Sequence, residues 1–218
     1  MDIFKKSLTA VAVALSLASG LAHADIMFLP GNNPQQSGEE NILFNGAGTI
    51  SGPALTVTGR TNQSDVLVAF TSTENLVTPA NGQARVDAAD GAFTDLTVSL
   101  LNGGTFGDLI FNLNAVQGDT GTAVITVHQV NGPDATYNLA VGNGENFLTI
   151  LATNGQRITS VDINSSTGVE MVNIDDGRQF RISEVQGPNN VPEPLPVSLL
   201  GAGLLGMLAM RRKGARGN

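Results

Sequence analysis

Residues 123–130, AVITVHQV, decide how this chain folds, because apolar and polar side chains alternate along them. Ile125 and Val127 alternate with Thr126 and His128. Successive side chains of a β-strand point to opposite sides, so this pattern predicts a strand with one face in a core and the other in water. We expect Thr126 and His128 to lie on the solvated face.

The same period of two recurs along the chain, and turn signals such as Asn154-Gly155 separate the segments. No long window carries the period of an amphipathic helix. Roughly ten to twelve short strands predict an all-β fold, a two-sheet antiparallel β-sandwich of jelly-roll-like topology, in preference to a small barrel. The clearest segments are 55–58, 66–70, 96–100, 110–113, 147–151, 158–163 and 179–185, with 26–29 expected to pair at an edge.

Residues 1–24 have the three parts of a secretory signal peptide. Two cations, Lys5-Lys6, precede an apolar stretch over 8–17, and Ala22-His23-Ala24 provides the small residues of a cleavage site. The stretch is too short for a comfortable membrane span. We therefore expect signal peptidase to cleave after Ala24, so that the mature chain begins at Asp25.

Residues 25–187 are expected to form one β-sandwich domain with a core of its own. Between residues 25 and 190 there are 17 acidic and five basic residues, a net charge of −12, and no lysine. Such a surface repels phosphate backbones, so nucleic acid is not an expected partner. The absence of cysteine excludes disulfides and thiolate metal sites.

The composition argues against an enzyme. His128 is the one histidine after the signal peptide, and no serine lies in a G-x-S-x-G motif. One histidine does not make a zinc site of the hydrolytic kind. A pair of carboxylates for glycoside hydrolysis remains open, but the chain has no tryptophan and one tyrosine to form a sugar platform. We predict no catalytic residues.

No motif requires a cofactor, and Ca²⁺ is the candidate ion. Calcium takes six to eight oxygen ligands, which acidic surface loops supply. Two loops, 87–91 and 173–177, contain the candidate ligands, although neither matches an EF-hand. The alternative is that Asp-Gly pairs here only form tight turns. The candidate ligands are Asp87, Asp90, Asp175 and Asp176.

Sugar binding is a further possibility in such a domain, because loops with Asn, Asp and an aromatic ring hold glycans in lectin-like sandwiches. The nearest candidates are the segment 142–147 and Tyr137. The alternative is that the aromatic residues belong to the core, as we expect for Phe70, Phe111 and Phe147.

Residues 188–218 have three parts in a fixed order. A linker over 188–194 ends in Pro192-Glu193-Pro194, an apolar stretch covers 195–210, and a basic tail over 211–218 begins with Arg211, Arg212 and Lys213. The apolar stretch predicts a transmembrane helix, somewhat shorter than the usual span of about 20 residues. The cations place the tail in the cytoplasm.

This order resembles the PEP-CTERM sorting signal, which exosortases recognise in bacterial surface proteins. The ends of the domain, PGNNPQ…EENILFN and ITSVDIN…RQFRISEV, also resemble β-sandwich cargo domains that carry such a tail. The resemblance implies an exported protein, anchored in the inner membrane, then cleaved and delivered to the cell surface or extracellular matrix. The alternative is a single-pass anchor that is never cleaved.

The implied partners are signal peptidase, exosortase and exopolysaccharide, and the implied role is structural or adhesive, as in a biofilm. A carbohydrate-binding, lectin-like module that uses Ca²⁺ is the alternative function.

Overall fold

The computed structural model describes residues 25–33, 37–79, 85–167 and 170–187. The predicted signal peptide with Ala22 and Ala24, the Pro192-Glu193-Pro194 motif, the apolar stretch 195–210 and the basic tail all lie outside these residues. Contacts divide the chain between Gly187 and Pro188, and the fold described below belongs to the first unit. Across the described residues, no helix is long and apolar enough to cross a membrane.

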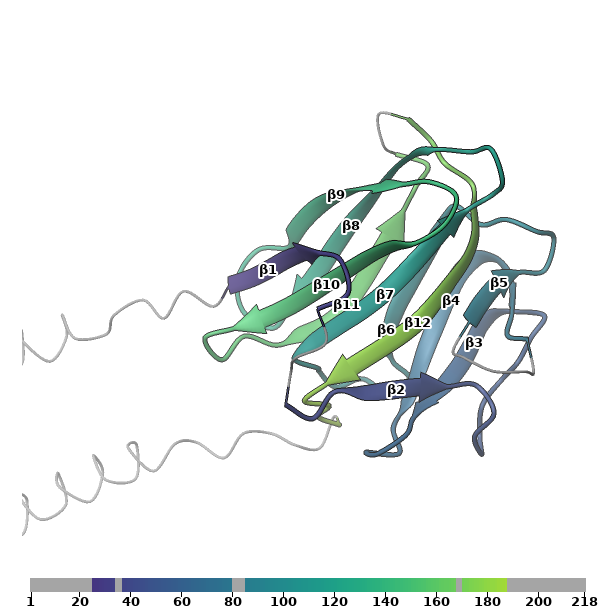
Figure 1. The fold of residues 1–218 in the computed structure, drawn as a ribbon. Coiled ribbons are helices and arrows are strands. Elements are labelled where there is room, and N and C mark those ends of the chain that lie inside the picture. Colours follow the sequence, from purple (N-terminus) through teal and green to yellow (C-terminus); the bar gives the residue numbers. More distant parts are fainter. Residues whose placement is uncertain (1–24, 34–36, 80–84, 168–169, 188–218) are drawn as a thin grey trace, which may run out of the picture. The chain divides into compact units, whose positions relative to one another are not determined.

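The prediction of an all-β fold is confirmed, since the described residues form strands, turns and loops without a helix (Figure 1). The strands are β1 Asp25–Pro30, β2 Glu40–Leu43, β3 Ala54–Thr61, β4 Leu67–Val77, β5 Arg85–Ala88, β6 Asp95–Leu100, β7 Asp108–Ala115, β8 Gly121–Gln129, β9 Ala135–Val141, β10 Asn146–Thr153, β11 Ile158–Asn164 and β12 Ile174–Ser183.

Hydrogen bonds join the strands along one path, in the order β1-β10-β7-β12-β2-β3-β4-β6-β11-β8-β9, with β5 pairing β12 and β4. All pairs are antiparallel. The finer prediction, a two-sheet sandwich, is not confirmed. β2 pairs with both β12 and β3, and β5 with both β12 and β4, so these two short strands join all the strands into one hydrogen-bonded path.

Aromatic contacts show how the path folds over on itself. Phe180 of β12 lies 4.7 Å from Phe70 of β4, measured between ring centroids, and 6.2 Å from Phe111 of β7. Phe28 of β1 stacks on Tyr137 of β9 at 5.2 Å, although these strands are the two ends of the path. The strands around β7 and β12 therefore face those around β4 and β8 across a shared apolar core (Figure 1).

The structure corrects the reading of Asp176-Gly177 as a turn, because both residues lie within β12. That strand pairs with β5 on one side and β7 on the other. A Cβ atom at Gly177 would come within 2.8 Å of the Phe180 ring. The glycine therefore makes room for a core ring and does not bend the chain.

Two further expectations change. Strands β5 and β9 were not predicted, and Asp87 lies in β5 and not in a loop. Phe70 and Phe111 are fully buried as expected, but Phe147 is only partly buried and is absent from the core cluster. Leu148 and Ile150 occupy the inward positions of β10, so alternation turns Phe147 outward.

Candidate functional site

The outward side chains of β3, β4, β6, β11, β8 and β9 form a surface that we call the polar face. On β6, for example, Leu96 and Val98 are buried in the core, so Thr97 points away from it. Residues at paired positions on neighbouring strands lie side by side, so one residue from each strand falls on a single line across the face. We call this line the cross-strand row. From β3 to β9, the row consists of Thr56, Thr71, Thr97, Asp162, Thr126 and Thr136.

Asp162 of β11 connects the row to a histidine. One carboxylate oxygen accepts a hydrogen bond of 2.7 Å from the Thr97 hydroxyl, and the other lies 2.8 Å from Nε2 of His128. The second ring nitrogen of His128, Nδ1, lies 3.0 Å from a carboxylate oxygen of Asp134. His128 thus bridges two carboxylates. It lies on the solvated side of β8, as the alternation predicted.

The hydrogen bond to Asp162 raises the pKa of His128 above its ordinary value, Asp134 raises it further, and partial burial opposes both. Both ring nitrogens face carboxylates, which only accept hydrogen bonds, so this arrangement favours the doubly protonated ring. In that form the ring has no free lone pair with which to act as a general base. This geometry suits a charged bridge that holds Asp162 in place.

A groove of about 380 Å³ lies on the polar face between β4, β6 and β11. It is open to solvent, and Thr97 and Asp162 of the cross-strand row contribute to its wall. The other polar side chains around it carry hydroxyl, carboxylate or amide groups. They are Thr73, Thr94, Asp95, Asn164 and Ser166.

Asp95 accepts hydrogen bonds from the backbone and the hydroxyl of Thr73, the backbone bond being 2.9 Å long. Within the described part of the chain, it forms no ion pair. Burial raises the pKa of the nearby Glu74, and the charges of Asp90 and Asp95 raise it further. The groove therefore opens in a region of negative potential.

The candidate calcium ligands are distributed differently from the prediction. Asp87 and Asp176 lie opposite each other on β5 and β12, and each forms an ion pair with an arginine of its own strand, Arg85 and Arg178 respectively. Asp176 is almost fully buried.

The other two candidates, Asp90 and Asp175, form no ion pair within the described residues. Asp90 is exposed in the turn after β5, and Asp175 accepts a 3.2 Å hydrogen bond from the amide of Asn114. Among the described residues, no three acidic or histidine side chains come together in a group that could hold a metal. Calcium binding at these positions stays a prediction.

The predicted sugar-binding segment 142–147 is tied to the fold. The Asn146 amide donates to the backbone oxygens of Leu113 and Gly142, at 2.9 and 2.7 Å, and its backbone N–H donates to Asn112. Tyr137, the other candidate, stacks on Phe28 against the core. Asn146 and Tyr137 therefore have structural roles within the fold. The groove of the polar face, which the sequence did not predict, is the better candidate for a binding site.

No protein-family model matches this sequence, and the curated proteins include no match to it. Among solved structures, an arginine-to-alanine mutant of CBM29-2, a family 29 carbohydrate-binding module, has a TM-score of 0.35 and 16% identity, covering 72% of this chain and 99% of its own. A second such module, CBM29_1 from Piromyces equi, has a TM-score of 0.31 and 11% identity, covering 77% and 95%. Both TM-scores are too low to indicate a shared fold.

Proposed function

We propose that this chain is an exported surface or extracellular-matrix protein whose β-domain binds polysaccharide through the groove of the polar face. The observation that carries the proposal is the chemistry of the groove, whose polar side chains are all hydroxyls, carboxylates or amides. Sugar hydroxyls donate and accept hydrogen bonds, and these groups match them in both directions.

The groove carboxylates are held in position before any ligand arrives. Thr97 and His128 fix Asp162, and Thr73 fixes Asp95. A preorganised site loses less conformational freedom on binding than a mobile one. Because the polar side chains of the groove include no aromatic ring, we expect each site to bind weakly and the protein to gain strength from many contacts along a polymer.

Export and sorting complete the proposal. A signal peptidase would release Asp25 as the N-terminus, and an exosortase would act at Pro192-Glu193-Pro194 while the stretch 195–210 lies in the inner membrane. The folded sheet would then serve outside the cell as a jelly-roll-like β-sandwich with a structural or adhesive role in exopolysaccharide. The protein itself is proposed to be a binding module and not an enzyme.

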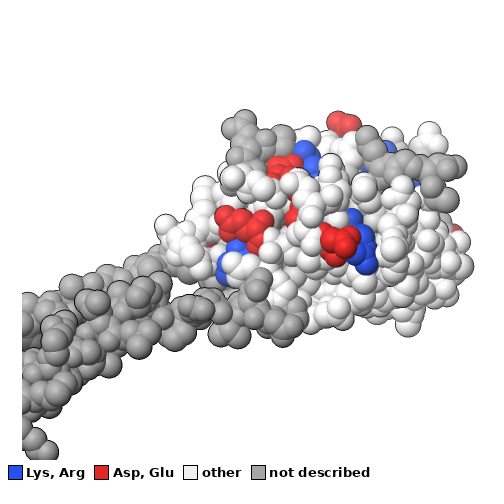
Figure 2. Space-filling view, turned by 90° about the horizontal axis from the view of Figure 1, so that it is seen from below, with Lys and Arg blue, Asp and Glu red and all other residues white. Residues whose placement is uncertain are grey.

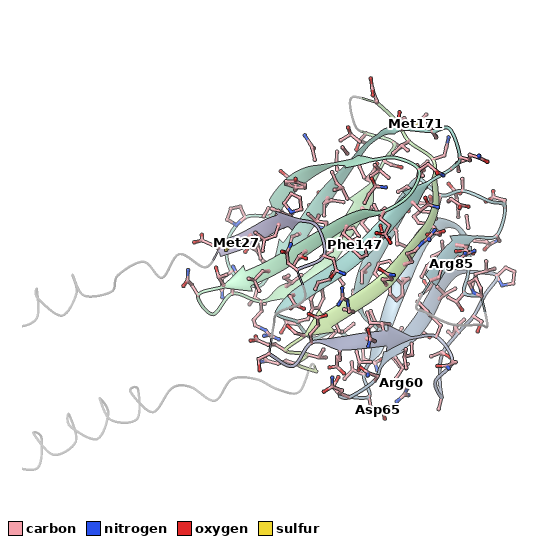
Figure 3. The ribbon with its side chains drawn as sticks, in the orientation of Figure 1. Met27, Arg60, Asp65, Arg85, Phe147 and Met171 are labelled. Atoms are coloured by element: carbon pink, nitrogen blue, oxygen red, sulfur yellow. The ribbon has the colours of Figure 1, made fainter. Side chains whose placement is uncertain are left out.

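The test is co-sedimentation of the full chain, solubilised in detergent, with insoluble exopolysaccharide from its host, in CaCl₂ and in EDTA. We expect saturable binding, and a loss of about tenfold in affinity for Asp162→Asn, because one hydrogen bond to a charged group is worth roughly 1.5–3 kcal/mol. Asp65→Asn is the matched control, since Asp65 lies in the exposed turn between β3 and β4 beside Arg60 (Figure 3). Absence of binding in both solutions contradicts the proposal.

A further inference from the structure

The residues of the cross-strand row are evenly spaced, because the strands of a sheet are evenly spaced. Neighbouring strands lie about 4.8 Å apart, so six strands carry one polar side chain at each step over a length of about 24 Å. Thr71 and Thr136 are exposed, and the other four side chains are half-buried. The row is therefore an extended strip, accessible along its length, that runs perpendicular to the strands.

The side chains of the row are stiff. Threonine is β-branched, which restricts its first side-chain torsion. The hydroxyls of Thr56 and Thr71 are 2.9 Å apart and bond to each other, and Thr97 donates to Asp162. A hydroxyl can donate one hydrogen bond and accept two, so each bonded threonine keeps capacity for a ligand.

The row and the groove are one surface, since Thr97 and Asp162 belong to both. A ligand that fills the groove and continues along the row must be long, thin and rich in hydroxyls. A single linear polysaccharide chain has this shape, and a globular partner does not.

The charge of the domain narrows the class of polysaccharide. Every arginine between residues 25 and 190 is already paired with a carboxylate, and Figure 2 shows blue atoms beside red ones on a largely uncharged surface. The pairs are Arg60–Asp65, Arg85–Asp87, Arg157–Glu184, Arg178–Asp176 and Arg181–Glu39.

Asp95 forms no ion pair with any arginine of the described residues. Asp95, a carboxylate of the groove wall, therefore favours a ligand that brings its own positive charge, whereas the charge of Asp162 is already balanced by His128. An anionic polysaccharide would be repelled by the same surface.

We propose that the polar face binds a linear polysaccharide that carries free amino groups, lying across the strands along the cross-strand row with an ammonium group at Asp95. This inference rests on the proposed function and adds to it the class of glycan, the direction of the chain and the residues that select it.

Two ligands with one backbone test the charge. The full chain is titrated with the hexamer of β-1,4-linked glucosamine and with the same hexamer after complete N-acetylation, which removes the charge. We expect the amine form to bind at least tenfold more tightly at low ionic strength, and added salt to remove most of that difference. Equal binding, or tighter binding of the acetylated form, overturns the inference.

Variants test the position of the chain. Asp95→Asn should weaken the amine hexamer about tenfold and leave the acetylated one unchanged, whereas Asp65→Asn should change neither. Thr126→Val should weaken the hexamer about threefold to tenfold, the effect of one hydrogen bond. Thr153→Val, on β10 in the other half of the fold, is its control. Wild-type affinity in both Asp95→Asn and Thr126→Val overturns the placement along the row.

The outcomes separate the two proposals. If the protein sediments with exopolysaccharide but does not prefer the amine hexamer, the proposed function stands and the present inference is wrong. If no polysaccharide binds, both are wrong. Circular dichroism of each variant shows that a loss of binding is not a loss of fold.

Discussion

The outer surfaces on the two sides of the core follow the same alternation but have different surroundings. The polar face is open, and most of its side chains are half-exposed. On the other side, the outward side chains of β10, β7 and β12 form what we call the covered face. There every residue of β7 is buried, and Ile110 and Thr149 are fully inaccessible.

We call the described residues between β1 and β2, 31–33 and 37–39, the cover, because three contacts tie them to strands of this face. The Gly31 N–H donates to the backbone oxygen of Phe147 at 2.8 Å, and the Asn33 N–H donates to the Thr149 hydroxyl at 3.1 Å. At the other end, Arg181 of β12 forms an ion pair of 2.9 Å with Glu39.

Burial on both sides leaves polar atoms of β7 poorly hydrogen-bonded. Within the described residues, the carboxylate oxygens of Asp108 and the amide nitrogen of Asn112 have no well-formed hydrogen bond, although Ser183 lies close enough to Asp108 to interact with it. Burial raises the pKa of Asp108 to about 6, although Ser183 opposite lowers it, and the charges of Glu39 and Glu184 raise it. The comparison teaches that an outward polar residue favours or opposes folding according to whether the rest of the fold leaves it in water or buries it.

The largest expected effect comes from breaking the contact between the two halves of the fold. Phe180→Ala removes a fully buried ring that packs on both Phe70 and Phe111. We expect the free energy of unfolding to fall by about 3–5 kcal/mol. Urea denaturation measures it, with Phe147→Ala on the covered face as the control. An equal loss in both variants would contradict the central role of Phe180.

Asp108→Asn is expected to stabilise the protein near neutral pH. The native carboxyl keeps its proton up to about pH 6, whereas the unfolded chain releases it near pH 3.8. Between these values the folded state binds more protons, so stability is lost as pH rises through this window. The loss is about 3 kcal/mol above pH 6, at 1.36 kcal/mol per pKa unit.

Urea denaturation from pH 4 to pH 8 checks this prediction. The Asn variant should match the wild type at the acid end and exceed it at the alkaline end. Asp119→Asn is the control, because hydrogen bonds from Asn173 lower the pKa of Asp119 and its removal should destabilise at neutral pH. A wild type whose stability rises between pH 4 and pH 6 while Asp108→Asn is unchanged would contradict it.

Removing the anchor of the cover has the next effect. Arg181→Leu leaves Glu39, whose side chain is only 13% exposed, without its cation. We expect a loss of about 1–2 kcal/mol, less than for a fully buried pair. The control is Arg85→Leu, which breaks a more exposed pair and should cost about 0.5 kcal/mol or less. Thermal unfolding compares the two, and equal losses would show that the Arg181–Glu39 pair stabilises the fold no more than an exposed pair does.

Much of this architecture could be predicted from alternation alone, because the pattern is local. It placed Thr126 and His128 on the outside of β8 correctly. It failed at Asp176-Gly177, where pairing with β5 and β7 and the nearby Phe180 ring outweigh the turn preference of the dipeptide. It also missed β9, which contains Asn and Ala, residues that disfavour strands. Pairing with β8 at seven positions outweighs that low strand propensity.

The candidate site could not be predicted, because strand order is not a local property. Thr97 and Asp162 are 65 positions apart, and only the pairing of β6 with β11 brings them together. The burial of the covered face could not be predicted for the same reason. Alternation indicates that Asn112 is solvated, but the structure buries it completely.

The smallest expected effect is on the open face, where the His128 bridge titrates. Asp162 and Asp134 raise the pKa of His128, so the folded state binds the proton more tightly than the unfolded chain. This contribution is complete below the ordinary histidine pKa of about 6.5 and is lost as pH rises through the higher folded value. Because the ring is 36% exposed, solvent screens the pair, and we expect about 0.5 kcal/mol or less.

Nuclear magnetic resonance of the His128 ring measures this pKa directly, since the chain contains only one other histidine, His23. The midpoint should lie above 6.5, and Asp162→Asn should lower it more than Asp134→Asn, because the bond to Asp162 is the larger cause. A midpoint at or below 6.5 in the wild type would mean that the bridge does not hold Asp162. The polar face would then lack a preorganised carboxylate, and it would differ from the covered face only in its exposure to solvent.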